Sequence, residues 1–372
     1  MTPTGRRPAA MALYLSDRSG VENRSMRAAD APADAIPSPA TSAEEELREI
    51  VSLLTRELDL GNATELTRLE GGRNNRVYRV VAGNRPMLLK QYYRDAGDPR
   101  DRLAADFGFS RQAWHSGVRA IAEPLLADPL LGLALYGFLE GRRLREGEPD
   151  EVHVDQAFDL VVAVNRQRLA PEARALPFAA EAVFCIADHL AAIEARLQRL
   201  ARIQPRDVLD ERALQLVREE LQPRFAQAER DCGSLVEERN LTGAQRILSP
   251  SDFGFHNALI DASGRLFFFD FEYAGWDDPA KLVCDFFCQV EVPVPIALLP
   301  RVVERVIRDL GVEERQRQRI AALLPLFRLK WACILLNEFL PAAAPRRQFA
   351  GATTDLRDQQ LEKAARLFDG LR

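Results

Sequence analysis

The chain is poor in the residues that hold transition metals or form disulfide bonds. Its 372 residues include four histidines and five cysteines, and neither set shows the paired spacing of a zinc site. The scattered cysteines also give no basis for a disulfide framework, so we expect buried thiols in a reducing, cytoplasmic setting. No G-x-S-x-G, G-x-G-x-x-G or Walker A pattern is present, which removes the sequence support for several common catalytic and nucleotide-binding folds.

Positive charge and long apolar runs are also scarce. The formal net charge is −5 and the sequence pI is about 5.7. Such a chain has no general basic field, and nucleic acid is therefore not an expected partner. The most apolar late segment, Ile320 to Leu340, is interrupted by Arg328, Lys330, Asn337 and Glu338, which are costly in lipid. We expect a core helix there and no contact with a membrane.

Residues 1–42 are rich in alanine, proline, serine, aspartate and arginine, and they show little periodicity. This composition predicts a disordered leader. The apolar run Met11–Leu15 is too short for a signal peptide, and Met11 and Met26 are alternative translation starts. The folded part is predicted to begin with a helix over Glu44–Leu60, where apolar residues recur three or four apart until Gly61 ends the pattern.

The chain then predicts a small β-rich lobe, which together with the first helix covers residues 43–139. Short runs of strand-forming residues alternate with turn signals such as Gly83-Asn84. The predicted strands cover Leu66–Leu69, Arg76–Val81 and Pro86–Tyr93, with two more, split by Gly132, within Leu131–Leu139. A helix is predicted over Asp101–His115.

Helical periodicity dominates residues 140–372, which follow a glycine-containing hinge at Glu140–Arg143. A hairpin at about 248–272 interrupts the helices, and residues 150–240 are predicted as a helical insertion on the substrate side. An apolar stripe within 178–203 fits either the core of this lobe or a surface for a partner helix, and a homodimer stays open. The predicted helices cover Val152–Arg168, Phe178–Ile203, Leu209–Glu238 with a break at Pro223, Leu282–Val290, Ile296–Leu310, Glu313–Leu340 and Leu356–Leu371.

Three polar side chains occur at fixed intervals around the hairpin. Asn257 follows Asp252 by five residues, and Asp270 stands after the apolar run Leu266–Phe269. Phosphoryl transfer from a nucleotide needs one carboxylate to orient the attacking hydroxyl, and an amide and a second carboxylate to hold Mg²⁺ against the phosphates. Each residue alone is compatible with an ordinary turn or strand-end role, but a single shared site explains all three.

Lys90 ends the apolar strand segment Pro86–Leu89, where its charge would be placed to fix the α- and β-phosphates of a nucleotide. The alternative is a solvent-facing strand lysine. An acid from the following helix should pair with Lys90 and hold its orientation. Asp106 is the candidate, with Asp101 and Asp98 as alternatives.

A glycine-rich turn precedes Lys90 and contains Gly71, Gly72, Asn74 and Asn75. Glycine permits close approach of the backbone, so amide groups here would reach phosphates. The alternative is a turn whose glycines serve its geometry alone. His256 lies in the loop after Asp252, and we favour a packing or backbone hydrogen-bonding role for it over acid–base chemistry.

Together these residues resemble the aminoglycoside phosphotransferase and choline kinase family of small-molecule kinases, from roughly Leu66 to Leu340. The resemblance implies an α+β, protein-kinase-like fold with a small antiparallel β N-lobe and a larger, mainly helical C-lobe. It also implies that Asp252 is the catalytic base and that Asn257 and Asp270 bind Mg²⁺.

The same resemblance implies a nucleotide site that takes ATP or GTP. Lys90 would contact the phosphates, with Asp106 as its acidic partner, and Gly71 to Asn75 would form the nucleotide loop. The segment from Phe138 through Glu140 to Gly141 would be the hinge against which the base lies.

The chain also departs from the family pattern. Pro250 and Ser251 stand where the family has histidine and glycine, and Asp106, which replaces a glutamate, is one methylene shorter. The later acid of the Asp-Pro segment is displaced to Asp285. The implied function is Mg-dependent phosphorylation of a small-molecule hydroxyl. The alternatives are a catalytically silent nucleotide-binding regulatory pseudokinase and a helical interaction protein.

Overall fold

The structure is a computed structural model that describes residues 39–69, 75–94, 100–237, 240–340 and 355–368, with side chains from Glu44 onward. Contacts between Cα atoms divide the chain into two compact units, Met1–Leu47 and Arg48–Arg372. Of the first unit, only the start of helix α2 (Pro39–Glu57) is described. This helix begins before the predicted start of the folded part, and most of the predicted leader lies outside the described residues.

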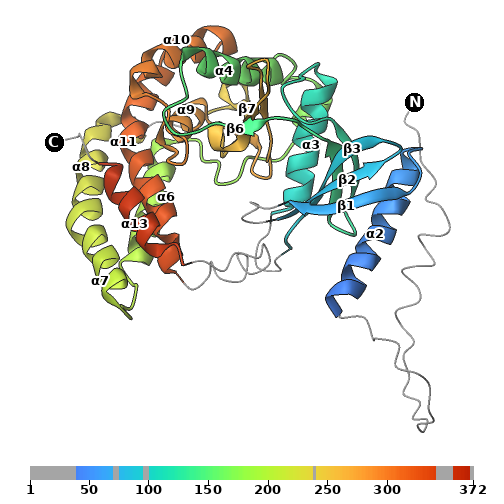
Figure 1. Cartoon of the computed structure of the whole chain (residues 1–372). Coiled ribbons are helices and arrows are strands. Elements are labelled where there is room, and N and C mark those ends of the chain that lie inside the picture. Colours follow the sequence, from blue (N-terminus) through green and yellow to red (C-terminus); the bar gives the residue numbers. More distant parts are fainter. Residues whose placement is uncertain (1–38, 70–74, 95–99, 238–239, 341–354, 369–372) are drawn as a thin grey trace. The chain divides into compact units, whose positions relative to one another are not determined.

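An antiparallel five-stranded sheet with strand order β1-β2-β3-β5-β4 forms the N-lobe (Figure 1). Gly83 and Asn84, both in the left-handed region at φ 55° and 60°, make the two-residue turn between β2 and β3. Pro124–Asp128 was not predicted as a strand. By contrast, Leu131 and Gly132 form a turn, and only one of the two strands expected within 131–139 is present. The strands are β1 (Ala63–Leu69), β2 (Arg76–Ala82), β3 (Arg85–Gln91), β4 (Pro124–Asp128) and β5 (Leu133–Gly137).

Helix α3 (Arg102–His115) contacts β4 and β5 and agrees with the predicted helix within one residue. Asp101 caps its N-terminus by accepting a hydrogen bond from the Ala104 backbone nitrogen at 2.9 Å. A small apolar cluster, which includes Leu103, Ala134 and Tyr136, lies between this helix and the sheet. The buried side of α3 therefore brings its polar residue Asp106 to the end of β3.

Two small antiparallel sheets begin the C-lobe. One joins β6 (Arg142–Arg143), β8 (Ala258–Ile260) and β9 (Leu266–Phe268), and the other joins β7 (Ile247–Ser249) and β10 (Gly275–Asp277). The chain leaves the five-stranded sheet after Gly137 and enters the first of these at Arg142. A Cβ on Gly141 would lie 2.8 Å from the Ile260 carbonyl oxygen, so the crossing needs glycine there.

Helices make up most of the remaining C-lobe, and several differ from the predicted ones. The helix expected over 178–203 begins only at Ile186, because Phe178 and Ala179 pair with Trp276 through their backbones. No break occurs at Pro223, which lies in the first turn of α8, where proline is tolerated. Instead a π-helical turn, Leu216–Leu221, precedes it. The α-helices are α4 (Glu151–Asn165), α5 (Pro171–Arg174), α6 (Ile186–Leu200), α7 (Val208–Gln215), α8 (Gln222–Cys232), α9 (Pro279–Cys288), α10 (Leu299–Leu310), α11 (Gln316–Leu335) and α13 (Arg357–Arg366).

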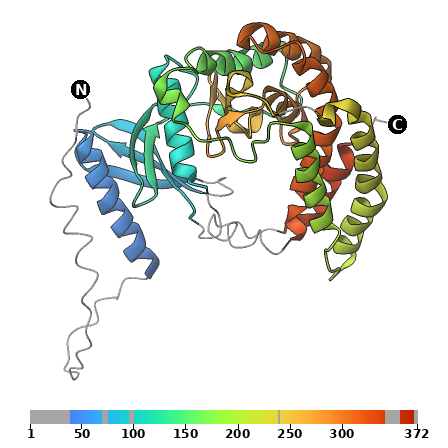
Figure 2. The ribbon, with the colours of Figure 1, turned by 180° about the vertical axis from the view of Figure 1, so that it is seen from behind.

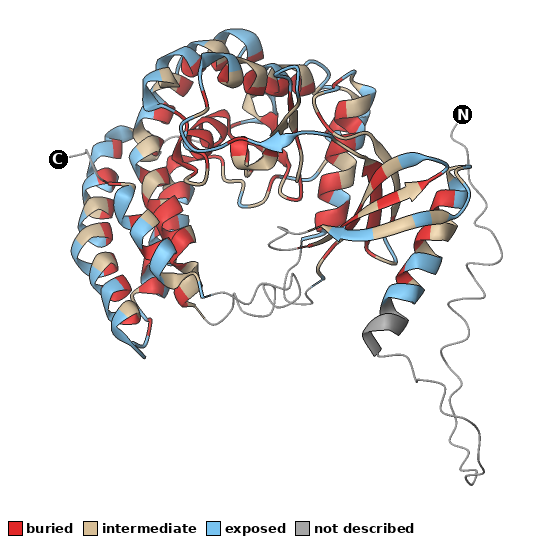
Figure 3. Ribbon diagram, viewed as in Figure 1, coloured by how far each residue is buried: buried red, intermediate tan, exposed pale blue. Residues whose placement is uncertain are grey.

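Helix α11 lies at the centre of the C-lobe helices and contacts α6, α8, α9 and α13 (Figure 2). In the described part of the chain, the segment Gln316–Phe339 is the one helix long and apolar enough to cross a membrane, and half of its most apolar window is buried inside the protein. Figure 3 shows the buried faces of α6 and α11. The predicted core helix is therefore present. The α6 stripe is also buried, so its interpretation as an exposed partner surface is wrong.

Candidate active site

Lys90 lies at the end of β3, and its ammonium group contacts two carboxylates. Its Nζ donates to Asp106 Oδ2 at 2.6 Å, and it also donates to the Asp270 carboxylate. The predicted pairing with Asp106 is thus confirmed, and the short aspartate side chain reaches the lysine directly. Burial alone would lower the pKa of Lys90, but the charges of Asp106 and Asp270 raise it well above its ordinary value. Of the alternative acids, Asp101 caps α3 and Asp98 lies outside the described residues.

The Asp106 carboxylate has two further donors that the sequence did not reveal. Tyr92 donates its hydroxyl proton to Oδ2 at 2.8 Å, and the Phe271 backbone nitrogen donates to Oδ1 at 3.2 Å. The Tyr92 and Tyr136 hydroxyls lie 2.9 Å apart. Burial and the charge of Asp106 raise the pKa of Tyr92 well above its ordinary value, so Tyr92 stays a donor. The sequence contains one indication of the Tyr92 contact. Tyr92 follows Lys90 by two residues, and residues two apart in an extended strand face the same side, so both side chains are expected to reach the same partner.

Glu272 is a second buried acid, and it connects the glycine-rich turn to the segment after β9. Its carboxylate accepts from Asn75 Nδ2 and from Arg102, each at 2.8 Å. The Asn75 side-chain oxygen in turn accepts from the Tyr93 backbone nitrogen at 3.1 Å. Asn75 therefore anchors the end of the turn, and its contact with a nucleotide stays a prediction. The other predicted residues of this turn, Gly71, Gly72 and Asn74, lie outside the described residues.

The loop after β7 holds Asp252 in an unusual backbone conformation. Ser251 and Asp252 have φ values of 50° and 24°, a region that residues other than glycine rarely adopt. Two side chains that follow Asp252 are inserted into the core, where Phe253 and Phe255 contact Phe286 at ring-centroid distances of 5.4 and 5.5 Å. The loop is thus anchored by aromatic packing, while the Asp252 side chain stays 37% exposed.

Asn257 and His256 contact Asp252 from the following turn. Asn257 Nδ2 donates to the Asp252 carbonyl oxygen at 3.1 Å, which leaves its amide oxygen as the atom suited to bind a cation. His256 Nε2 lies 3.4 Å from Asp252 Oδ1, so this histidine faces the carboxylate itself. Arg143 donates to the His256 carbonyl oxygen at 3.0 Å, a contact that does not involve the imidazole, so the packing or hydrogen-bonding role of that side chain stays a prediction.

Asp270 and Asn257 are brought together by the β8–β9 hairpin. Ala258 pairs with Phe268, and one residue further out the Phe269 backbone nitrogen donates to the Asn257 carbonyl oxygen at 3.1 Å. Asp270 follows at once, in the left-handed region at φ 69°. Its side chain is 34% exposed, so the carboxylate is open to solvent while it contacts Lys90.

These donors fit Mg²⁺ better than a transition metal. One carboxylate and one amide oxygen are hard ligands, and Mg²⁺ in proteins is commonly held by one or two carboxylates with phosphates and water completing the shell. In the described residues, no group of three or more histidine, cysteine, aspartate or glutamate side chains could hold a metal alone. A cation bound by Asp270 and Asn257 would need further ligands, such as phosphate oxygens or water.

The predicted hinge follows β5. The Arg79 guanidinium lies 5.5 Å from the centroid of the half-buried Phe138 ring, and Glu140 is exposed. The contact with Arg79 restricts one face of the ring. The roles of Phe138 and Glu140 in binding a nucleotide base stay predictions.

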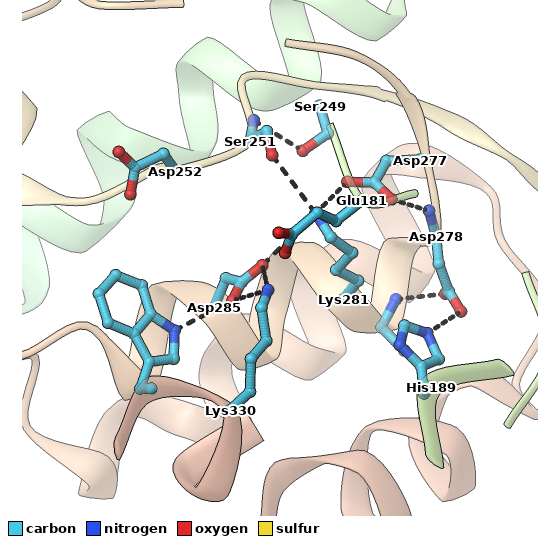
Figure 4. A network of polar contacts seen from close by, with 12 residues as sticks. Glu181, His189, Ser249, Ser251, Asp252, Asp277, Asp278, Lys281, Asp285 and Lys330 are labelled. Atoms are coloured by element: carbon cyan, nitrogen blue, oxygen red, sulfur yellow. Dashed lines mark hydrogen bonds and ion pairs between the residues drawn. The ribbon is translucent and has the colours of Figure 1, made fainter. Parts of the chain in front are cut away.

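A buried polar network lies beneath the Asp252 loop (Figure 4). Lys281 of α9 donates to Asp277 at 2.6 Å and to the Ser251 hydroxyl at 3.3 Å. Asp285, one turn further along α9, accepts from Lys330 and from the Trp331 indole at 2.9 and 3.0 Å. Sequence reasoning noted Asp285 but missed Lys281, although Lys281 and Asp285 are four residues apart, the spacing of one helix face.

Comparison with known proteins identifies the family and the fold. Solved structures with a similar fold include a spectinomycin phosphotransferase in complex with ADP and spectinomycin (10% identity, TM-score 0.59, covering 87% of this chain and 94% of that chain). A choline/ethanolamine kinase family protein from Mesorhizobium loti (18%, 0.53, 88% and 95%) and a Plasmodium vivax ethanolamine kinase (12%, 0.54, 88% and 89%) are also similar.

These likenesses confirm the α+β, two-lobed kinase-like fold. No match was found among curated proteins. The model of the phosphotransferase enzyme family matches residues 65–323, which include Lys90, Asp252 and Asp270. The chain therefore belongs to the phosphotransferase enzyme family.

Proposed function

We propose that the protein is a kinase that transfers the γ-phosphate of ATP or GTP to a hydroxyl of a small molecule. The observation that carries this proposal is the joining of Lys90 to both Asp106 and Asp270, because it links the N-lobe strand to the candidate metal carboxylate of the C-lobe. Such a lysine supplies a fixed positive charge for phosphates. The ADP bound to the spectinomycin phosphotransferase supports a nucleotide as co-substrate.

Asn257 and Asp270 would hold Mg²⁺, which when bound neutralises charge on the phosphates. Asp270 is suited to this because its carboxylate is partly exposed, and Asn257 because its amide nitrogen is already used by the loop. Asp252 would accept a hydrogen bond from the acceptor hydroxyl, orient its oxygen and receive its proton as transfer proceeds. The contact from His256 restricts the directions in which the Asp252 carboxylate can point.

The alternative of a silent pseudokinase rested on Pro250 and on the shortness of Asp106. The direct ion pair with Lys90 removes the second reason. An active enzyme is therefore the better proposal, with Pro250 as the departure that an assay must address.

Charge around the loop supports an acceptor other than a polycation. Asp277 and Asp285 are balanced by Lys281 and Lys330, and Glu181, which precedes α6, is paired with Arg196. A polycationic acceptor would favour uncompensated carboxylates. We therefore propose a neutral or mixed-charge hydroxyl compound.

The cellular setting and the assembly state are proposals as well. All five cysteines are buried and free of disulfide bonds, which supports a reducing cytoplasmic location. The expectations that nucleic acid and membranes are not partners, and that the chain could form a homodimer, stay predictions.

The decisive experiment combines nucleotide binding with an acceptor panel. Purified protein is tested for thermal stabilisation by ATP or GTP with Mg²⁺, and then for ADP or GDP release with metabolites, sugars and antibiotics of different charge. Asp270→Ala should abolish the Mg-dependent stabilisation, whereas Asp252→Asn should keep it and lower transfer by about 100-fold or more. Absence of any nucleotide-induced stabilisation in the wild type would overturn the proposal.

A further inference from the structure

We propose that Lys281 is a positioning residue for phosphoryl transfer, which holds the catalytic loop from below through the Ser251 hydroxyl and so fixes the neighbouring Asp252. The inference rests on the proposed function, in which Asp252 orients the acceptor hydroxyl. Lys281 lies outside the loop and is not one of the residues proposed to contact the metal or the nucleotide.

The geometry around Lys281 is that of a fixed contact. The side chain is 2% exposed, and it points from α9 toward the loop (Figure 4). Its Nζ lies 2.6 Å from Asp277 Oδ2, 3.4 Å from Asp285 Oδ2 and 3.3 Å from Ser251 Oγ. The two carboxylates hold the ammonium group in place, and the third contact is directed at the residue before Asp252.

The loop needs an external contact because its backbone is strained at two consecutive positions. Neither Ser251 nor Asp252 is glycine, yet both have φ in the left-handed region. Ser251 is held at both ends by side chains, since its backbone nitrogen donates to Ser249 Oγ at 3.0 Å and its own hydroxyl accepts from Lys281. Pro250, between them, offers no side-chain hydrogen bond and no backbone donor.

Asp252 is held on its other side by Asn257, which donates to the Asp252 carbonyl oxygen. Among the described residues, His256 forms the ion pair with the Asp252 carboxylate, and the Asp252 side chain is 37% exposed. Its direction is therefore set mainly by the backbone between Ser251 and Asn257. Releasing the Ser251 end would let the strained residues relax, and the carboxylate would move.

The charge of the network keeps Lys281 protonated. Burial would lower its pKa, but the charges of Asp277 and Asp285 raise it above its ordinary value. Lys330, which is bonded to Asp285 at 2.9 and 3.1 Å, balances the second carboxylate. Lys281 is thus a permanent donor, and the contact with Ser251 should not depend on pH near neutrality.

The first test is Ser251→Ala, which removes the hydroxyl and leaves every charge of the network in place. If the contact positions Asp252, kcat should fall by about 10-fold to 100-fold, since displacements near 1 Å cost rates of that order. The KM for the nucleotide and the Mg-ADP affinity should stay within about twofold, because Lys90, Asn257 and Asp270 are untouched. The melting temperature should change by only a few degrees, about the effect of one lost hydrogen bond.

Thr55→Val is the matched control for Ser251→Ala. Thr55 is fully buried in α2, and its hydroxyl donates to the Gly61 carbonyl oxygen at 2.7 Å, far along the chain from the loop. It should show a similar or larger loss of melting temperature with kcat unchanged. If Ser251→Ala keeps wild-type kcat, or loses activity only in proportion to its folded fraction, the inference is overturned.

Variants of Lys281 test the other end of the contact. Removing the lysine alone leaves buried acids unbalanced and risks misfolding. The double variant Asp277→Asn/Lys281→Met is charge-balanced, because Asp285 keeps Lys330. It should fold, bind Mg-ADP like the wild type and show the same fall in kcat as Ser251→Ala. Adding Ser251→Ala to it should lower kcat no further, and additive losses would contradict a shared contact.

Failure of this inference is distinct from failure of the proposed function. Absence of nucleotide binding and transfer in the wild-type protein would overturn the proposed function itself. A wild type that transfers phosphate while Ser251→Ala and the double variant transfer equally well would overturn the role of Lys281 alone.

Discussion

Lys90 and Lys281 are the buried lysines among the described residues, and they differ in the exposure of their partners. Lys90 contacts Asp270, whose side chain is 34% exposed, as well as the buried Asp106. The carboxylates around Lys281, Asp277 and Asp285, are 0% and 7% exposed. A partner open to solvent can exchange its contacts with an entering ligand, whereas a buried partner cannot without loss of charge balance.

The comparison shows that burial of a cation does not by itself mark a functional group. Lys90 lies where the two lobes meet, and its partner Asp270 also belongs to the candidate metal site. Phosphates that enter this site can therefore rearrange the ion pairs of Lys90. The buried charges around Lys281 are two lysines and two aspartates, which we call the closed network, and the half-exposed Glu181 also acts on Lys281. The effect of Lys281 on chemistry is transmitted through a single hydroxyl. We expect mutation of Lys281 to affect stability more than mutation of Lys90 does, and mutation of Lys90 to affect phosphate transfer more than stability.

The largest expected effect is that of Lys281→Ala on stability. Asp277 would keep one neutral donor, the Asp278 backbone nitrogen at 2.9 Å, and would be left as a buried charge. Breaking one partner of a buried pair costs about 3–5 kcal/mol, to be measured as the free energy of unfolding in urea. A loss below about 1 kcal/mol would show that Lys281 is not part of a closed charge network.

Lys90→Met should show the reverse pattern. Asp106 would keep two donors, the Tyr92 hydroxyl and the Phe271 nitrogen, so the stability loss should be smaller than for Lys281→Ala. Transfer should fall by about 100-fold or more in kcat/KM, because the phosphates lose a fixed positive charge. A Lys90→Met variant that is less stable than Lys281→Ala and still transfers phosphate would contradict this distinction between the two lysines.

The contacts of Lys90 show how far sequence reasoning reached. A strand lysine followed by a helix that contains an acid predicted the Asp106 pair, and the hairpin spacing predicted that Asn257 and Asp270 lie together. These contacts lie within or between adjacent elements. The contacts of Glu272 with Asn75 and Arg102 bridge residues 170 or more apart, and no local pattern specifies such a pairing.

In the segment before α6, a local sequence pattern predicts a helix that the structure does not contain. Helical periodicity over 178–203 predicts one helix, but the Trp276 backbone forms hydrogen bonds with the backbones of Pro177 and Ala179. A Cβ on Gly275 would lie 2.3 Å from the Pro177 carbonyl oxygen, so this close pairing depends on a glycine nearly 100 residues away. Tertiary pairing of this kind overrides local propensity, and the sequence pattern could not reveal it.

Tyr92→Phe should give an intermediate effect that refines the picture of the Lys90 site. It removes one neutral donor from Asp106 and should cost about 1 kcal/mol of unfolding free energy. We expect a fall of several-fold in kcat/KM as Asp106 and Lys90 lose a fixed neighbour. Tyr136→Phe is the matched control, because the Tyr136 hydroxyl forms its hydrogen bond with the Tyr92 hydroxyl and not with the carboxylate. Equal kinetic effects of both variants would contradict the special role of Tyr92.

A third ionic cluster differs from the two lysine sites because one of its cations, Arg206, is at the surface. Asp210 of α7 is fully buried, and hydrogen bonds from Arg206 lower its pKa from 3.8 to about 2, with Arg357 of α13 adding to the shift. A depressed pKa stabilises the fold at pH values above the unfolded pKa. This contribution is lost as pH falls from about 4 to about 2.

The difference in unfolding free energy between the wild type and Asp210→Asn should therefore be constant near neutrality and should shrink below about pH 4. High salt should reduce it, because Arg206 is 64% exposed and its charge is screened. Asp358→Asn is the control, since Asp358 joins the same helices through a half-exposed pair with Arg212. It should have little effect at any pH. If Lys281→Ala showed the same salt sensitivity as Asp210→Asn, the distinction between a closed buried network and a surface-linked one would not hold.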